Sequence, residues 1–152
     1  MSETADQPYR VLTAVQLRDM AITNADYALF RPDTARYWAN VVNKDHAETL
    51  VAETHEQEAD LYLVLAGEGE LYLGGVILDL TTPTPGQQRG TGISGATRYV
   101  LHAGDIAHIP AGTPHLLDVR TGCLTYVVVK IALKDRSDEE GVFTCGREHY
   151  IA

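Results

Sequence analysis

Short apolar or alternating segments, separated by turn residues, dominate the chain from Tyr37 onward and restrict its fold more than any other feature. Glycine and proline punctuate these segments, and no helical period of useful length lies between them. This pattern is typical of an all-β sandwich or barrel. We therefore predict an antiparallel all-β domain over residues 37–133. The segments read YWANVV, TLVAET, LYLVLAGEGELYLGG, RYVLH, DIAHIP, HLLDV and CLTYVVVKIAL.

One helix is predicted before the strands. Thr13 and Gln16 form a possible capping box, in which each residue satisfies a backbone or side-chain donor of the other. Apolar residues follow at helical spacing, which predicts a short helix over Ala14–Ile22. We expect residues 1–36 to form an arm that packs on the barrel, and residues 134–152 to form a C-terminal tail.

The charge balance argues against a nucleic-acid partner. The chain has 21 acidic and 12 basic residues and a formal net charge of −9, which repels phosphate backbones. No segment reaches the roughly 18 apolar residues of a membrane-spanning helix, so no membrane partner is expected. The first residues lack signal-peptide features, and Cys123 and Cys145 do not suggest a disulfide framework. We expect a cytoplasmic location.

The segment Thr81–Thr97 differs from the rest of the strand-rich region. Its 17 residues are rich in Gly, Pro, Thr and Gln and offer little to bury. Loops longer than roughly 12–15 residues are uncommon in compact domains and are often functional. We predict a long polar loop. It is expected to act as a lid that brings Gln87, Gln88 or Arg89 toward an anionic substrate, or to be a plain surface loop.

Two spaced sets of residues point to chemistry. Gly104, Pro110, Gly112 and His115 follow the pattern G-x5-P-x-G-x2-H. Upstream, the strand text DLYLVLAGEGEL begins at Asp60 and contains Gly67, and two further polar residues precede it. That second set consists of Glu53, His55, Asp60 and Gly67.

Together the two sets resemble the two motifs of the cupin superfamily. The second motif is matched up to its last position, where Val119 replaces the family's Asn. In the first motif Ala47 replaces the initial Gly, Glu53 replaces the first His, and Asp60 replaces the Glu. The resemblance covers roughly residues 37–133. It implies a cupin barrel, a double-stranded β-helix of jelly-roll type, that binds one divalent metal ion.

The resemblance implies His55, His115, Glu53 and Asp60 as the metal ligands. Side chains alternate along a strand, so Glu53 and His55 share one face. Two imidazoles and a carboxylate match the ligand set of non-heme iron sites. Replacing a His by Glu53 makes the site harder, which favours iron or manganese, with zinc or nickel also possible. The alternative is a metal-free pocket in which salt bridges compensate the carboxylates.

Tyr62 and Lys130 are predicted to bind substrate. Tyr62 shares strand parity with Asp60, and Lys130 interrupts the apolar strand VVVKIAL. A buried lysine is rare unless it is paired, so a cation that faces an acidic substrate would explain it. The alternatives are a core tyrosine and a lysine whose ammonium reaches solvent at the strand end.

The expected function is that of a metal-dependent enzyme acting on a small organic molecule, of dioxygenase, isomerase or lyase type. In this hypothesis Glu53 and Asp60 act as ligand and possible base. The alternative is a non-catalytic cupin that binds a small ligand or a metal as a sensor or carrier. A homodimer is also expected, because exposed strand edges invite pairing.

Overall fold

The computed structural model describes residues 9–22, 27–31, 36–46 and 49–133. The first eight residues and the predicted tail, residues 134–152, lie outside this part of the chain. Within it, the helix α1 (Ala14–Ile22) precedes a series of strands. The strands are β1 (Tyr27–Phe30), β2 (Tyr37–Asp45), β3 (Ala52–His55), β4 (Glu58–Leu73), β5 (Val76–Leu78), β6 (Thr81–Thr84), β7 (Gln87–Gly90), β8 (Gly92–Ser94), β9 (Thr97–His102), β10 (Ile106–Ile109), β11 (His115–Asp118) and β12 (Cys123–Ala132).

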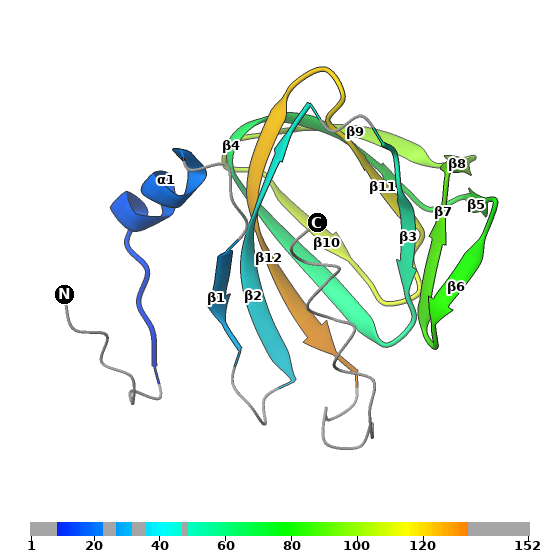
Figure 1. The fold of residues 1–152 in the computed structure, drawn as a ribbon, viewed down its shortest axis with the longest axis horizontal. Coiled ribbons are helices and arrows are strands. Elements are labelled where there is room, and N and C mark those ends of the chain that lie inside the picture. Colours follow the sequence, from blue (N-terminus) through cyan, green and yellow to red (C-terminus); the bar gives the residue numbers. More distant parts are fainter. Residues whose placement is uncertain (1–8, 23–26, 32–35, 47–48, 134–152) are drawn as a thin grey trace.

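The long strand β4 organises the sheet. Its first half pairs with β10 and β12, and its second half pairs with β9 and β11. The order β1-β2-β12-β4-β11-β3-β7-β6 then wraps around into the barrel shown in Figure 1. Every strand pairing among the described residues is antiparallel. The predicted all-β barrel with one short N-terminal helix is confirmed.

A glycine allows β4 to pass from one half of the barrel to the other. Gly67 has a positive φ of 82°, a conformation that is costly for residues with a side chain. A Cβ at this position would also collide with the backbone carbonyl oxygen of Cys123, on the neighbouring β12. The motif glycine is therefore required for the close approach of two strands, and not for contact with a ligand.

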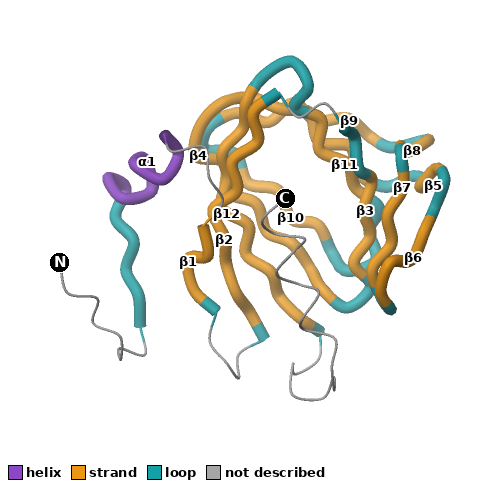
Figure 2. Tube along the Cα trace, viewed as in Figure 1, coloured by secondary structure: helices purple, strands orange, loops and turns teal. Residues whose placement is uncertain are grey.

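The helix forms as predicted and covers the outside of the barrel. The Thr13 backbone N–H donates to Gln16 Oε1 over 2.9 Å, and the Gln16 N–H donates back to Thr13 Oγ1 over 3.3 Å. Leu17 and Met20 pack against an apolar cluster on the outer face of β2 and β12. Figure 2 shows the helix beside the strands. Strand β1, within the predicted arm, pairs with β2, so the sheet begins before Tyr37.

The prediction of a long loop over Thr81–Thr97 is wrong. The segment contains β6, β7 and β8. Strands β6 and β7 form a hairpin around Gly86, whose φ is 77°. Strand β7 pairs with β3, and β8 pairs with β5. Backbone hydrogen bonds to distant strands hold this polar segment in place, although it has few apolar side chains to bury.

The interior of the barrel is apolar at one end and polar at the other. Alternation along β4 and β12 points Val64, Tyr126 and Val128 inward, where they join the largest buried cluster. Farther along the same faces lie Asp60 and Lys130, which are directly opposite each other in the register of the two strands. No helix among the described residues is long and apolar enough to cross a membrane.

Candidate metal centre

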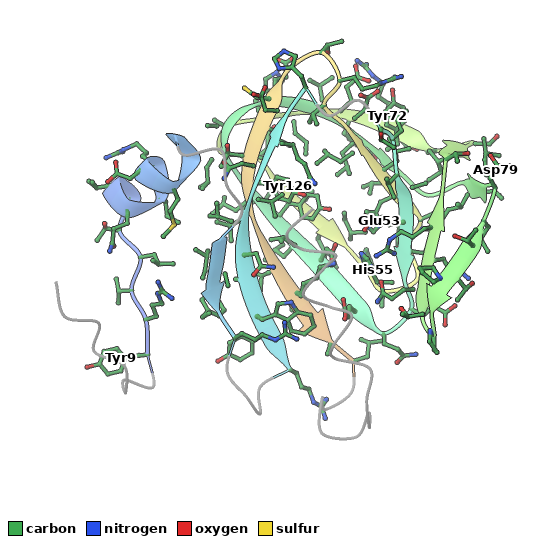
Figure 3. All side chains as sticks on the ribbon, in the orientation of Figure 1. Tyr9, Glu53, His55, Tyr72, Asp79 and Tyr126 are labelled. Atoms are coloured by element: carbon green, nitrogen blue, oxygen red, sulfur yellow. The ribbon has the colours of Figure 1, made fainter. Side chains whose placement is uncertain are left out.

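Strands β3 and β11 position the two histidines of the candidate site. The strands pair so that His115 lies opposite Glu53, on the same face as His55. The backbone N–H of Gly112 donates to the carbonyl oxygen of His55 over 2.7 Å, which ties the turn before β11 to the end of β3. Figure 3 shows Glu53 and His55 on the β3 side of the barrel interior, and Tyr126 on the side of β12. Motif residues far apart in sequence thus meet.

Two imidazoles and one carboxylate converge closely enough to hold a metal ion. His55 Nε2 lies 3.2 Å from Glu53 Oε2, and His115 Nε2 lies 3.9 Å from the same oxygen. The potential ligand atoms of the three residues all lie within 4.8 Å of one another. Both histidines are buried, whereas Glu53 is partly exposed. The three residues have the composition of a 2-His/carboxylate site.

The other ring nitrogens are held by acceptors. His55 Nδ1 lies 2.6 Å from Gln87 Oε1, and His115 Nδ1 lies 3.0 Å from the carbonyl oxygen of Thr113. Each Nδ1 therefore carries the proton, and a neutral ring presents a lone pair at Nε2. Neither Nε2 has a hydrogen-bond partner among the described residues, although both are buried.

This arrangement fits a cation. When both rings are neutral, two imidazole lone pairs and the oxygens of Glu53 face one another at a distance where acceptors repel. A positive charge between them, either a proton or a metal ion, converts the repulsion into attraction. Metal-binding histidines commonly donate their second N–H to a carbonyl or carboxylate, as both rings do in this barrel.

The electrostatics of the site keep Glu53 ionised and His115 neutral. Burial raises the pKa of the Glu53 carboxyl, but a hydrogen bond from His55, which requires a protonated ring, and the charge of Arg89 outweigh it and leave this pKa below its ordinary value. Burial and the neighbouring His55 lower the pKa of His115, against the opposing charges of Asp60 and Glu53. A deprotonated carboxylate and a neutral imidazole are the forms that bind a metal.

Asp60 faces both the site and Lys130. Its Oδ2 lies 3.7 Å from His55 Nε2 and 3.8 Å from His115 Nε2. Its Oδ1 lies 2.6 Å from Lys130 Nζ, and Glu58 lies 3.9 Å from the same ammonium. Asp60 and Lys130 are both buried, at 2% and 3% exposure. Asp60 thus presents one oxygen to the histidines and the other to a buried cation.

Tyr62 lies in the interior against Tyr126, with ring centroids 4.5 Å apart. Burial, Tyr126 and the carboxylates of Asp60 and Glu53 raise the pKa of Tyr62 well above its ordinary value, so its hydroxyl keeps the proton. The Lys130 ammonium thus contacts carboxylates of the protein, and the Tyr62 ring packs against Tyr126. The substrate-binding role of these two residues stays a prediction.

Sequence reasoning missed the part that β7 plays in the site. Gln87, Gln88 and Arg89 were expected in a lid or surface loop, whereas β7 forms part of the barrel wall beside β3. Gln87 contacts His55, and Arg89 Nε lies 4.0 Å from Glu53 Oε1. One signal was present, because the Pro85-Gly86 dipeptide between two short segments is typical of a hairpin turn.

Comparison with known proteins supports the fold. No protein-family model matches this chain, and no curated protein matches it by sequence. Among solved structures, the protein BH2720 from Bacillus halodurans is similar, with a TM-score of 0.57, 14% identity and 88% of each chain covered. The Cnp3 cupin domain from Schizosaccharomyces pombe has a TM-score of 0.50 and 12% identity, over 70% of this chain and 59% of that one.

KdgF from Halomonas sp. is similar to the same degree, with a TM-score of 0.50 and 16% identity over 74% of this chain and 81% of the other. Likeness at such low identity identifies the fold and does not identify an activity. The strand order, the second motif and these structures all indicate the cupin fold. The chain is a small cupin-fold protein, in which Glu53, His55 and His115 could hold a metal ion.

Proposed function

We propose that this cupin-fold chain binds one divalent metal ion through His55, His115 and Glu53. The observation that carries the proposal is the pair of buried Nε2 atoms, which lack a hydrogen-bond partner among the described residues and face a carboxylate. Each ring is locked by an acceptor at Nδ1, so each Nε2 offers a lone pair. A buried polar atom without a partner is costly, and a bound cation removes that cost.

The ligand set favours iron or manganese, and zinc or nickel would also fit two nitrogens and an oxygen. The metal would supply Lewis acidity, polarising an oxygen of a bound molecule. Among the described residues three side chains converge as ligands, so positions on the metal would remain for a substrate. This supports an enzyme that acts on a small organic molecule, of dioxygenase, isomerase or lyase type, over a sensor or carrier.

The two carboxylates receive different roles in this proposal. Glu53 is the ligand, because its Oε2 makes the shortest carboxylate contact with a histidine nitrogen, 3.2 Å from His55 Nε2, and because it completes the cluster of ligand atoms within 4.8 Å of one another. Asp60 is the base or a further ligand, because Lys130 holds Oδ1 while Oδ2 faces the site. Lys130 keeps a negative charge on Asp60 tolerable in the buried interior. Tyr62 would line the same space as a hydrogen-bond donor.

Elemental analysis tests the metal site. Protein purified without chelators or a histidine tag should contain about one divalent metal ion per chain, by the three-ligand site argued above. His55→Ala and His115→Ala should each remove it while the circular dichroism spectrum keeps its β-sheet shape. His108→Ala is the matched control, because this histidine lies on an exposed position of β10. Unchanged metal content in both site variants would refute the assignment.

The water relaxation rate of the Mn²⁺-loaded protein distinguishes the enzyme from the carrier. A catalytic site keeps a position open to water, whereas a site closed by four protein ligands is of the structural kind. Strong enhancement of water proton relaxation is the expected result. Relaxation no faster than in the His115→Ala control would favour the carrier.

A further inference from the structure

The amide of Gln87 contacts His55 Nδ1, the ring nitrogen that is not assigned to the metal. Gln87 and His55 lie on the same face of the barrel wall. Strand β7 pairs with β3 so that Gln87 lies opposite His55 and Arg89 lies opposite Glu53. Residues opposite each other in an antiparallel pair point to the same side of the sheet. Gln87 and Arg89 therefore point inward with the candidate ligands, whereas Gln88 between them points outward and approaches the exposed Glu56.

Arg89 determines which end of the Gln87 amide faces His55. Both Nη1 and Nη2 of Arg89 lie 3.4 Å from Gln87 Oε1, and Nη1 also donates to the Gln88 carbonyl oxygen over 2.8 Å. A guanidinium group only donates hydrogen bonds, so the amide atom facing it is the oxygen. That same oxygen lies 2.6 Å from His55 Nδ1. An acceptor at this distance requires a proton on Nδ1, and in the neutral ring this leaves Nε2 as the lone-pair nitrogen.

We propose that Gln87 is a positioning residue, which fixes the tautomer and the ring orientation of His55, and that Arg89 in turn fixes the orientation of the Gln87 amide. The inference rests on the proposed function in one respect, because the nitrogen so presented is the one assigned to the metal. The effect of Gln87 on the tautomer of His55 concerns the metal-free protein alone. Residues that hold a metal-binding histidine from behind typically change metal affinity by 10–100-fold when they are replaced.

His115 provides an internal reference. Its Nδ1 lies 3.0 Å from the backbone carbonyl oxygen of Thr113, an acceptor that no substitution at residue 87 removes. If Gln87 acts on His55 through the hydrogen bond, a change at residue 87 should alter His55 and leave His115 unaltered. A general loosening of the barrel would instead alter both rings.

The test compares Gln87→Leu with Gln87→Glu, with Gln88→Leu as the matched control. Leucine has a similar size and cannot accept a hydrogen bond, whereas the carboxylate of glutamate accepts one from Nδ1 and pairs with Arg89. Long-range proton–nitrogen NMR of the metal-free protein reads the tautomer of each ring. We expect wild-type, Gln87→Glu and Gln88→Leu proteins to hold the proton of His55 on Nδ1. In Gln87→Leu it should distribute over both nitrogens, with His115 unchanged.

Affinity for Zn²⁺ or Mn²⁺, measured by competition with a chelating dye, gives the second readout. Gln87→Leu should bind roughly 10–100-fold more weakly than wild type, and Gln87→Glu within a few-fold of it. An unchanged His55 tautomer in Gln87→Leu, or equal affinity losses in Gln87→Leu and Gln87→Glu, overturns the positioning role. Absence of metal binding in the wild type overturns the proposed function instead, while the tautomer measurement still decides the role of Gln87.

Discussion

Lys130 and Asp60 form a deeply buried ion pair beside the candidate site. The register of β12 and β4 places them directly opposite each other, and the ammonium nitrogen lies 2.6 Å from Asp60 Oδ1. Burying two charges costs several kcal/mol for each ion, which their mutual attraction offsets only when the geometry is good. The pair therefore fixes the orientation of Asp60 more than it adds to stability.

Lys130→Met should destabilise the metal-free protein strongly. Removing one partner leaves Asp60 as an uncompensated buried charge, which typically costs about 3–5 kcal/mol. The free energy of unfolding, measured with urea at neutral pH, checks this expectation. The double variant Lys130→Met with Asp60→Leu is the control, since it removes both charges and should lose less stability than the single variant. A single variant as stable as the double would show that the pair carries no such penalty.

At the scale of elements, strands β5 and β8 pack on the outer side of the site strands, and β7 pairs edge to edge with β3. The outer faces of β3 and β11 carry Ala52 and Leu116, which pack in a small cluster with Ile77 of β5. Strand β7 adds side chains that contact His55 and Glu53 from the inner face. The backbone of β7 approaches β5 closely at Gly90, where a side chain would not fit.

Gly90→Ala should disturb this support and Gly92→Ala should not. A Cβ at Gly90 would collide with Ile77 Cγ2 and the backbone oxygen of Leu78, so strands must shift. Overpacking of this kind typically costs about 1–3 kcal/mol. At Gly92 the nearest atom to an added Cβ is Leu78 Cδ1 at 3.5 Å, an ordinary contact. Thermal unfolding of the two variants checks the difference, and equal melting temperatures would contradict the packing described.

For the whole molecule, the barrel brings together residues that lie far apart along the chain. Glu53 and His55 come from β3, Asp60 from β4 and His115 from β11. Strand β11 pairs with both β3 and β4 within one ten-stranded sheet, and Lys130 enters from β12, which pairs with β4. A metal site formed by residues of β3 and β11 would exist only when the barrel is folded. The free energy of metal binding would therefore add to the stability of the fold.

A bound metal should therefore raise the melting temperature of the whole chain. At a free metal concentration of 100 times Kd, the stabilisation is about 2.7 kcal/mol. For a chain of this size that corresponds to a rise on the order of 5–10 °C. Differential scanning calorimetry with and without Mn²⁺ or Zn²⁺ measures it. His115→Ala should show little rise, and a rise as large as in the wild type would mean that the metal binds elsewhere.

The sequence by itself determined the elements whose signal is local. The Thr13/Gln16 capping box marked the helix at Ala14–Ile22, and alternating apolar residues marked the strands of the barrel. The resemblance to the cupin motifs brought out the residues that converge, and alternation along the strand added that Glu53 and His55 share a face. These features depend on neighbours a few residues apart, and such neighbours are visible in one sequence.

Only the tertiary structure decided the rest. Strand β7 is polar throughout, so no periodicity marked it, and it exists because its backbone pairs with β3 more than thirty residues away. Likewise, the lysine predicted to face a substrate lies opposite Asp60, and the register of two strands distant in sequence places it there. Hydrogen bonds between strands are made by backbone groups common to all residues. Their pairing therefore leaves no signal in local composition, and it is fixed only when the whole barrel closes.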